Sequence, residues 1–500
     1  MAFEHIPHTN THTIEQLISP KELPEAGFQS YTELVSDATE QKADFLANTQ
    51  RNPHLTYTYL GDTTRLDDGI AKLETAREEA MTLEDNELFR EAIGSSLDFR
   101  RAEMEYVKVL GGLNQLCHET TINTEKISET VELARQLGHE LYGRPRPEIR
   151  DAALNEMWAI LDGKQRSESA QRLYDELAYG SDWNGQALSP LPKAEDPAAR
   201  LPRFTDNEAL EWAGEKIIEK NADIYALVEK FWRDRVAEHG DTYSCQPADI
   251  AEVFQAVIDM RDPDHASGVT VRLAEDKTAL SWESSEMAVV VGVKRKAIPD
   301  SDELFRKVLH EFGIHGQRSI NGLKSKLPVL GTGLFTHTER PDYLTFEEGF
   351  ASTAESMIGH TVTDWSPVHL GYYINISLAE QGADFRTVFE TAWRYRVLAR
   401  LGDNQEVTDK AVANAKNTAY TACVRIFRGT QPDLQEKTGL AVTPLTFNKD
   451  LAYLEGRYLA MNHLEDIYKD RDTRAIDWLF AGKFDPTNPV QAEIMRAATQ

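Results

Sequence analysis

The chain has 500 residues, a formal net charge of −28 and 41% hydrophobic residues. This composition is typical of a globular protein with more than one domain. Its acidity argues against nucleic acids and anionic membranes as partners, because both are bound through basic surfaces. The longest apolar run near the motif described below, residues 287–293, is far too short to span a membrane.

The three cysteines are far apart and form neither a metal-ligand pair nor a disulfide framework, so a cytoplasmic location is expected. The first residues lack a basic segment followed by an apolar one, and no secretory signal is expected. Nothing in the sequence indicates the oligomeric state.

The chain is expected to divide into three parts. Residues 1–184 carry apolar residues at three- and four-residue spacings, which predicts a helical region. Residues 185–204 hold four prolines and little periodicity, which predicts a linker. Residues 205–500 form the third expected part. The predicted fold class is α+β and predominantly helical, with a small mixed sheet.

The sheet is expected from residues 268–276 and 278–293, which are rich in β-branched and alternating residues and predict two or three strands. The stretch AVVVGV (288–293) is expected to be an edge strand that could bind a substrate backbone. Asp300 and Glu303 have the spacing of a capping box, and a helix over 301–320 is expected to follow.

Residues 310–315 of that helix read HEFGIH. Zinc proteases of the H-E-x-x-H type place two histidines four residues apart on one helix face. Here the spacing is five, which separates the two side chains by about 140° on a straight α-helix. A widened turn, a π-bulge, would reduce this angle to about 50°. Gly313 would permit it, so the motif predicts a widened turn around Phe312–Gly313.

Catalytic zinc needs a third protein ligand and one open position. Glu348 and Glu355 share a helix face, an arrangement suited to one metal ligand and one carboxylate that hydrogen-bonds a zinc histidine. The residue pattern leaves the choice of third ligand open. The downstream candidates are His337, Glu339, Glu347, Glu348, Glu355 and His360.

Four ordered stretches resemble one known family. HEFGIHGQRSING, EEGFASTAE, RIFRG (425–429) and FNKDLAYLEG (447–456) follow the order seen in the microtubule-associated tyrosine carboxypeptidases (MATCAP), which include bacterial proteins with a QEGLA motif. LYGRP (141–145) is also similar to a family segment. The resemblance covers about residues 270–460, and the sequence departs from QEGLA at Glu347 and Phe350.

The resemblance implies a zinc metallopeptidase with one Zn²⁺ per chain. Residues 205–500 would be its catalytic domain, in which a zinc-binding helix pair lies beside the small sheet, as in gluzincins. It implies His310, His315 and Glu348 as ligands and Glu311 as the general base that activates water. A carboxypeptidase of this kind would remove one residue, with an aromatic residue such as tyrosine as a candidate, from the C-terminus of a peptide or protein.

Two further roles need side chains of other kinds. Tyr453 is the candidate donor that would stabilise the oxyanion, with Tyr343 as the second choice. The substrate's terminal carboxylate needs bases, for which arginine is suited. The candidates near the matching stretches are Arg318, Asn321, Arg425, Arg428 and Lys449.

Two other functions remain open. Dipeptidyl peptidase III enzymes also use H-E-x-x-x-H with a later glutamate, but they need carboxylates to hold a free N-terminus. A zinc-stabilised regulatory protein without activity would have no use for Glu311, and its metal site would need a fourth ligand, which His337 could provide.

Overall fold

The fold is taken from a computed structural model, which describes residues 24, 26, 38–57, 63–119, 121–203, 207–275, 277–335, 343–358 and 365–499. Its first half contains α3 (Ala38–Leu46), α4 (Thr64–Leu83), α5 (Glu87–Leu116), α6 (Thr124–Tyr142), α7 (Pro147–Asp162), α8 (Glu168–Tyr179), β1 (Ser181–Trp183), β2 (Gln186–Leu188), α9 (Glu208–Lys220), α10 (Ala222–His239) and α11 (Pro247–Arg261).

The second half begins with the segment that carries the motif, which contains β3 (Thr270–Ala274), β4 (Leu280–Glu283), β5 (Ala288–Gly292), α12 (Ser301–Val308), η1 (Leu309–Gly316) and α13 (Gln317–Leu323). The remaining elements are α14 (Val329–Thr332), α15 (Tyr343–Ile358), α16 (Pro367–Glu380), α17 (Phe385–Arg400), α18 (Asp409–Ile426), α19 (Leu434–Thr438), η2 (Asn448–Asp450), α20 (Leu451–Asp470), α21 (Thr473–Trp478) and α22 (Pro489–Thr499).

The predicted fold class, predominantly helical with a small mixed sheet, is confirmed. β1 and β2 form an antiparallel hairpin. The other sheet has the order β3-β5-β4, with β3 parallel and β4 antiparallel to β5. α12 begins where the capping signal predicts, because the Asp300 side chain accepts a hydrogen bond from the Glu303 N–H at 2.7 Å.

The expectation that AVVVGV forms a sheet edge is wrong. β5 lies between β3 and β4, and all five of its residues are buried, so both of its backbone edges are already paired. A continuous apolar run suits such a central strand better than an edge. β3 and β4 are the edge strands of this sheet, and β4 lies beside η1.

Two buried hydrophobic clusters meet at the motif. The larger contains residues from α4–α8 together with residues from α9 and α14–α22. The smaller joins α10–α13 to the three-stranded sheet. η1 contributes to both, since Leu309 and Ile314 belong to the larger cluster and Phe312 to the smaller. Because η1 packs against both clusters, only one narrow side of it remains for functional side chains.

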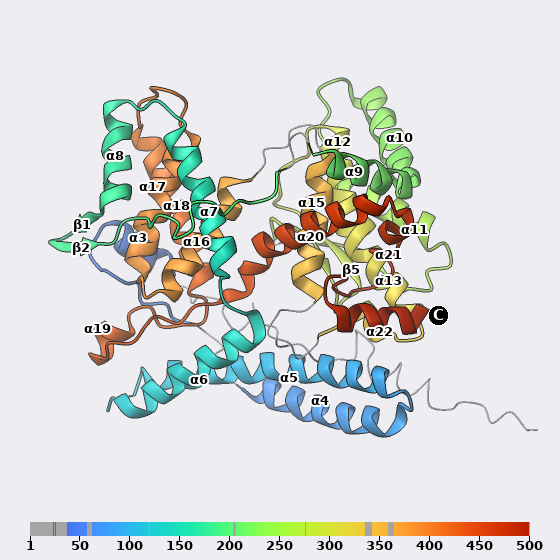
Figure 1. Cartoon of the computed structure of the whole chain (residues 1–500), viewed down its shortest axis with the longest axis horizontal. Helices are drawn as coiled ribbons and strands as arrows, with labels where there is room; N and C mark the ends of the chain where they lie inside the picture. The colour runs from blue at the N-terminus through green and yellow to red at the C-terminus, as the bar shows by residue number, and fades with distance from the viewer. Residues whose placement is uncertain are drawn as a thin grey trace, which may run out of the picture.

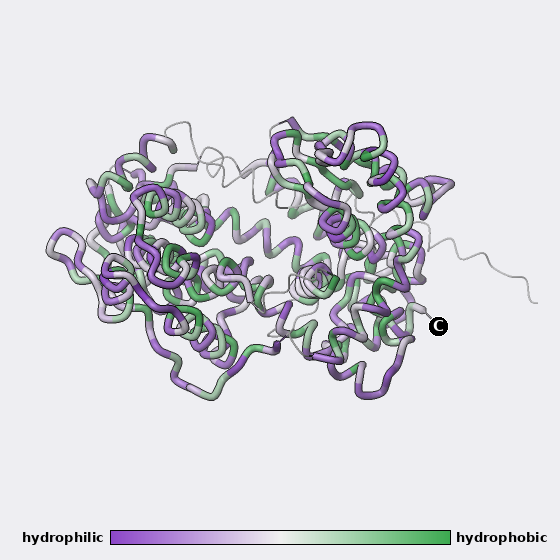
Figure 2. Tube along the Cα trace, turned by 90° about the horizontal axis from the view of Figure 1, so that it is seen from above, coloured by the Kyte–Doolittle hydropathy of each residue, from purple (hydrophilic) through white to green (hydrophobic). Residues whose placement is uncertain are grey.

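The elements form two groups, and α4, α5 and α6 lie below both of them in the view of Figure 1. One group holds α7, α8 and α16–α18, and the other holds the three-stranded sheet with α9–α15. α20 runs from the first group into the second. Seen from above, hydrophobic segments lie inside both groups and hydrophilic segments outside (Figure 2).

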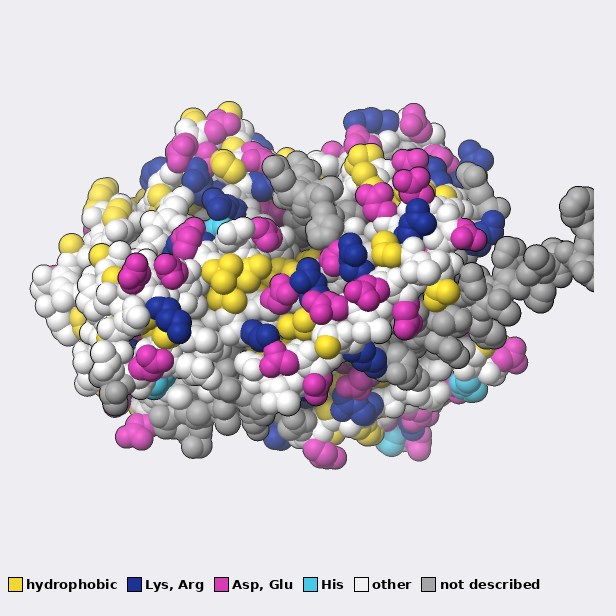
Figure 3. All heavy atoms as spheres, turned by 90° about the horizontal axis from the view of Figure 1, so that it is seen from below, with side chains coloured by type: hydrophobic (Ala, Val, Ile, Leu, Met, Phe, Trp, Pro, Cys, Tyr) yellow, Lys and Arg dark blue, Asp and Glu magenta, His cyan; other side chains and the backbone are white. Residues whose placement is uncertain are grey.

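The N-terminal helices share a core with the later ones, since α7 contacts α16, α8 contacts α17, and α5 contacts α14 and α22. The proline-rich segment itself buries Leu188, Leu191 and Leu201. The division of the chain at residues 185–204 stays a prediction. Acidic and basic side chains are mixed over the lower face, where α4 and α6 lie (Figure 3). Within the described residues, every helix is too short or too polar to cross a membrane.

Candidate metal centre

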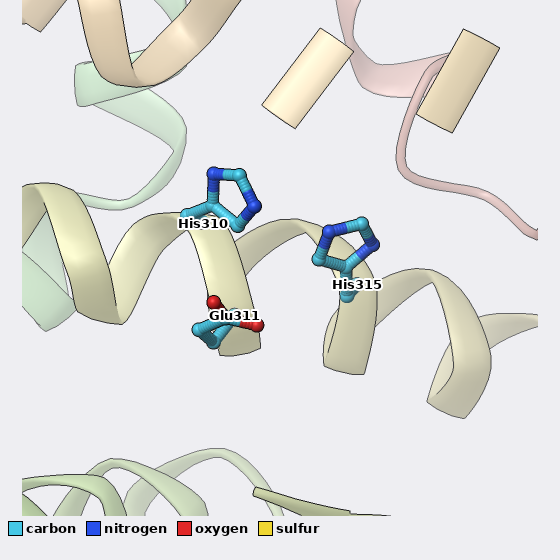
Figure 4. A group of neighbouring side chains, drawn as sticks. All are labelled: His310, Glu311 and His315. Carbon is cyan, nitrogen blue, oxygen red and sulfur yellow. The ribbon is translucent and has the colours of Figure 1, made fainter. Parts of the chain in front are cut away.

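The five-residue spacing of the two histidines is resolved by the backbone. Residues Leu309–Gly316 form a π-helix, so the predicted widened turn is confirmed and extends over the whole motif. The imidazole rings of His310 and His315 stand on the same side of this helix (Figure 4), with their centroids 5.0 Å apart. Ligand atoms of His310, Glu311 and His315 all lie within 4.8 Å of one another.

Gly313 supports this turn through its lack of a side chain. A Cβ at this position would lie 2.8 Å from the Leu309 side chain and 3.4 Å from Oδ1 of Asn221, which is itself buried. The backbone of Gly313 does not have a positive φ, so its conformational freedom is not what the turn requires. Close packing between η1 and the start of α10 is the reason for a glycine here.

Each histidine has a carboxylate from α15 behind it. Nδ1 of His315 lies 2.8 Å from Oε1 of Glu347, and Nδ1 of His310 lies 3.0 Å from Oε2 of Glu355. With Nδ1 facing a carboxylate, Nε2 of each ring remains for a metal ion. Metal-binding histidines have this arrangement in most proteins, because the carboxylate fixes the ring and raises its basicity.

Glu347 is the centre of a buried ion network that the sequence did not indicate. Besides His315, its carboxylate contacts the guanidinium of Arg318 at 2.9 Å and the Lys483 ammonium. The side chains of Glu347, Arg318 and Lys483 are each at most 1% exposed. Burial alone would raise the pKa of Glu347, but the two cations and the His315 bond hold that pKa well below its usual range.

Glu355 has a similar but less buried setting. Its second oxygen lies 2.5 Å from the Lys307 ammonium. Burial works against its charge, yet His310 and Lys307 lower its pKa to about 2. For His310, burial disfavours the cation, but the carboxylates of Glu355, Glu311 and Glu348 outweigh it and raise the pKa to about 9. The surroundings therefore stabilise positive charge at this ring.

Glu311 is buried and aimed at the edge strand. Its Oε2 accepts a hydrogen bond from the Trp282 N–H of β4 at 2.8 Å. Burial raises the pKa of Glu311, and the neighbouring histidines oppose that shift only in part. A carboxyl with a raised pKa beside two imidazoles is the kind of group that accepts and returns protons.

The opposite wall of the site is made by two helices that touch through glycines. A Cβ on Gly349 of α15 would lie 1.8 Å from the backbone of Gly456 on α20, and a Cβ on Gly456 would lie 1.8 Å from the Thr345 carbonyl. No other residue type fits at these positions. This contact brings Glu348 and Tyr453 to the same cavity.

The cavity has a volume of about 540 Å³, and the residues of the motif lie in its wall. Glu348 and Tyr453 line it, as does the second tyrosine candidate, Tyr343. Glu348 carries a charge close enough to raise the pKa of Tyr453, with burial, to about 12. The Glu348 carboxylate is nevertheless outside the group of atoms within 4.8 Å of one another. Among the other candidate third ligands, His337, Glu339 and His360 lie outside the described residues.

The five residues predicted to bind the substrate do not line this cavity. Arg318 is fully buried and bonded to Glu347 and two backbone carbonyls. Asn321 donates to the Phe480 carbonyl, and Arg425 pairs with Asp450 at 2.8 Å. Lys449 lies 4.0 Å from Glu103, and Arg428 lies over the Phe447 ring. In this structure the five side chains contact other parts of the protein, and their role in substrate binding stays a prediction.

Arg425 keeps one link to the site, since its guanidinium lies 3.4 Å from the Tyr453 hydroxyl. Sequence reasoning missed three residues that line the cavity, His369, Arg457 and Lys483, and it named Glu347 only as a possible metal ligand. One signal was available for Arg457, which follows Tyr453 by four residues and so shares its helix face. No neighbouring residue in the sequence identifies Lys483. Its ammonium donates to Glu347, which lies 136 positions away in the sequence.

One protein family matches the part of the chain that contains the cavity. A family model described as "Microtubule-associated tyrosine carboxypeptidase" matches residues 206–493, which include every residue of the cavity wall named above. No curated protein and no solved structure matches the chain.

Proposed function

Because the chain belongs to the microtubule-associated tyrosine carboxypeptidase family, we propose that it is a zinc-dependent peptidase that removes the C-terminal residue of a peptide or protein. The observation that supports this best is the π-helix, which brings His310, Glu311 and His315 together on one wall of a cavity. A protein that only needed a structural metal would not require a buried carboxyl such as Glu311 beside the histidines.

The donors present suit zinc. Two imidazoles that keep Nε2 for a metal, with carboxylates at Nδ1, and a further carboxylate on the facing helix form the His₂Glu set of catalytic zinc sites. His310, His315 and Glu348 would hold the ion. When bound, zinc supplies a Lewis acid that polarises the scissile carbonyl and acidifies water.

The remaining chemistry falls to side chains of this chain. Glu311 would take the proton of the attacking water and deliver it to the leaving amine. The Tyr453 hydroxyl, whose raised pKa keeps it protonated, would donate a hydrogen bond to the developing oxyanion. Arg425 holds that hydroxyl from behind at 3.4 Å.

The edge of β4 offers a place for the substrate backbone. Leu280, Ser281 and Trp282 of this strand line the cavity. An extended peptide that added itself to this edge would pass directly in front of Glu311, which already accepts a hydrogen bond from the strand.

A peptide-library digest read by mass spectrometry tests the proposal. Wild-type protein is expected to release single C-terminal residues, and both a chelator and Glu311→Gln should abolish release. Glu303→Gln, in the first turn of α12 and outside the cavity wall, is the matched control and should keep full activity. Release of N-terminal dipeptides would instead support a dipeptidyl peptidase III-like enzyme. Bound zinc without any cleavage would support a regulatory protein.

A further inference from the structure

The four arginines of α17 are of two kinds. Arg386 and Arg394 both pair with Glu390 of the same helix. The side chains of Arg396 and Arg400, at the end of the helix, have no ion pair or hydrogen bond with any described residue. The sequence contains 82 Asp and Glu residues against 54 Lys and Arg. Two neighbouring arginines without a counter-ion are therefore unusual in this chain.

Arg396 and Arg400 lie one turn apart on the same helix face, where two like charges destabilise a helix. Burial and the charge of Arg400 both lower the pKa of Arg396, and the opposing contribution comes from Tyr372 rather than from a carboxylate. The helix dipole favours a cation at Arg400, in the last turn. It does not account for Arg396, which is half-buried and whose Nε has no hydrogen-bond partner among the described residues.

A small cavity lies beside this pair, between α16, α17 and α18, with a volume of about 30 Å³. Arg396 and Arg400 line it together with Asn375 and two tyrosines, and the rest of its wall is proline, valine, glycine and alanine. None of the described residues in this wall is acidic. The volume exceeds the roughly 10–15 Å³ that one water molecule needs, and it suits one compact polar group.

Asn375 adds an uncharged polar group to the wall. It is only 5% exposed, yet its side-chain amide has no hydrogen-bond partner among the described residues. A buried amide without a partner costs free energy, because it has lost its bonds to water. Since Asn375 lines the cavity, a polar group bound there would supply the missing hydrogen bond.

The cavity is separate from the candidate metal centre, although α16 borders both. Pro367 and Val368 line the small cavity, whereas Ser366 and His369 line the larger one. The two walls have no described residue in common. A ligand of the small cavity would therefore bind without contacting the metal ligands.

We propose that Asn375, Arg396 and Arg400 form a binding site for a phosphate-sized oxyanion. A phosphoryl group carries up to two negative charges, which two guanidinium groups can balance, and its several oxygens can accept bonds from both. A carboxylate would balance only one of them. Free phosphate and the phosphoryl group of a small molecule share this chemistry. The inference is independent of the proposed function, because it uses none of the residues of that site.

Calorimetry on the full chain, titrated with inorganic phosphate, tests the inference. Metal is first removed with a chelator that is then dialysed away, so that no ion in the larger cavity can hold the phosphate. Binding of one phosphate per chain is expected. Arg396→Gln should weaken it at least about tenfold, because a charge-assisted hydrogen bond is lost. Asn375→Ala should weaken it about threefold without changing the charge of the site.

Arg306→Gln is the control, because it removes an arginine from the larger cavity and should leave the phosphate affinity unchanged. If Arg396→Gln does not fold, Arg400→Gln takes its place. The inference is overturned if the parent protein does not bind phosphate, or if the variants at Asn375, Arg396 and Arg400 bind it as tightly as the parent.

A parallel titration with glycerol 3-phosphate distinguishes the two sources of the oxyanion. Tighter binding of the monoester than of inorganic phosphate would identify a phosphorylated small molecule as the ligand. Tighter binding of inorganic phosphate would identify the free ion. In both cases the loss of affinity in Arg396→Gln is the result that supports the site.

Discussion

The two walls of the cavity are built in opposite ways. One wall is η1, a single stretch of eight residues in which His310, Glu311 and His315 are brought together by a local change in helix type. The other joins α15 to α20, whose touching glycines, Gly349 and Gly456, are 107 positions apart. The first wall can be inferred from a motif, but the second exists only because two distant helices meet.

The walls also depend on each other. α15 supplies a carboxylate to each histidine of η1, with Glu347 behind His315 and Glu355 behind His310. Glu347 is neutralised by two fully buried cations, whereas Glu355 pairs with one half-exposed lysine. The difference predicts that the two carboxylates matter for different reasons.

The glycine contact should show the largest effect on stability. Gly349→Ala or Gly456→Ala would place a Cβ inside another backbone, and we expect a loss of roughly 4 kcal/mol or failure to fold. Gly112→Ala, on α5 where an added Cβ meets nothing within 4 Å, is the control and should be neutral or stabilising. Urea unfolding measures both. Equal behaviour of the three variants would mean that α15 and α20 do not touch as described.

Glu347→Gln should be the next most damaging change. It leaves Lys483 and Arg318 buried without their counter-charge, which costs about 3 kcal/mol in comparable sites. Adding Lys483→Met removes one uncompensated charge and should restore part of the stability. A double-mutant cycle of unfolding free energies measures the coupling. Additive effects of the two substitutions would show that the ion network is absent.

Glu355→Gln should act on the metal more than on the fold. Its carboxylate is less buried, so the expected loss of stability is about 1 kcal/mol or less. Loss of the charge behind His310 should weaken zinc binding by about 10- to 100-fold. Competition with a zinc chelator measures this affinity. An unchanged affinity would mean that Glu355 does not support His310.

His369 gives a pH dependence with a defined sign. Its pKa of about 4 in the folded state is below the ordinary value of 6.5 for a histidine, so folding favours the neutral ring. The resulting stability is fully present above pH 6.5 and is lost as the pH falls toward 4, by about 2 kcal/mol after allowing for partial exposure. His369→Gln should therefore flatten the fall in unfolding free energy between these pH values. A fall that is equally steep in the variant would contradict the assignment.

The sequence predicted the parts of this site that depend on neighbours in the chain. The widened π-helical turn was predicted from the spacing of His310 and His315, and the start of α12 was predicted from Asp300. The place of AVVVGV in the sheet was predicted wrongly, although its continuous apolar run favours a central strand, and the order of its neighbours could not be predicted because they come from other parts of the chain. Glu347 was named only as a possible third ligand and as a departure from a motif, because the partners of its carboxylate come from other elements.

The basic residues near the motifs also depend on contacts between distant elements, which the sequence does not reveal. Arg318 is a base within a matching stretch, yet its side chain is buried in the interior and contacts Glu347. Arg457 lines the cavity because Gly456, the residue before it, lets α20 approach α15. Whether a side chain lines a cavity depends on such contacts between distant helices, and periodicity in the sequence alone does not reveal them.

Metal content tests most directly whether the two walls make one centre. Purified wild-type protein should hold one zinc ion per chain, as measured by inductively coupled plasma mass spectrometry. His315→Ala on the first wall and Glu348→Ala on the second should each lower zinc occupancy at least about tenfold at the same free-metal concentration. Full occupancy in either variant, or no zinc in the wild type, would contradict the account.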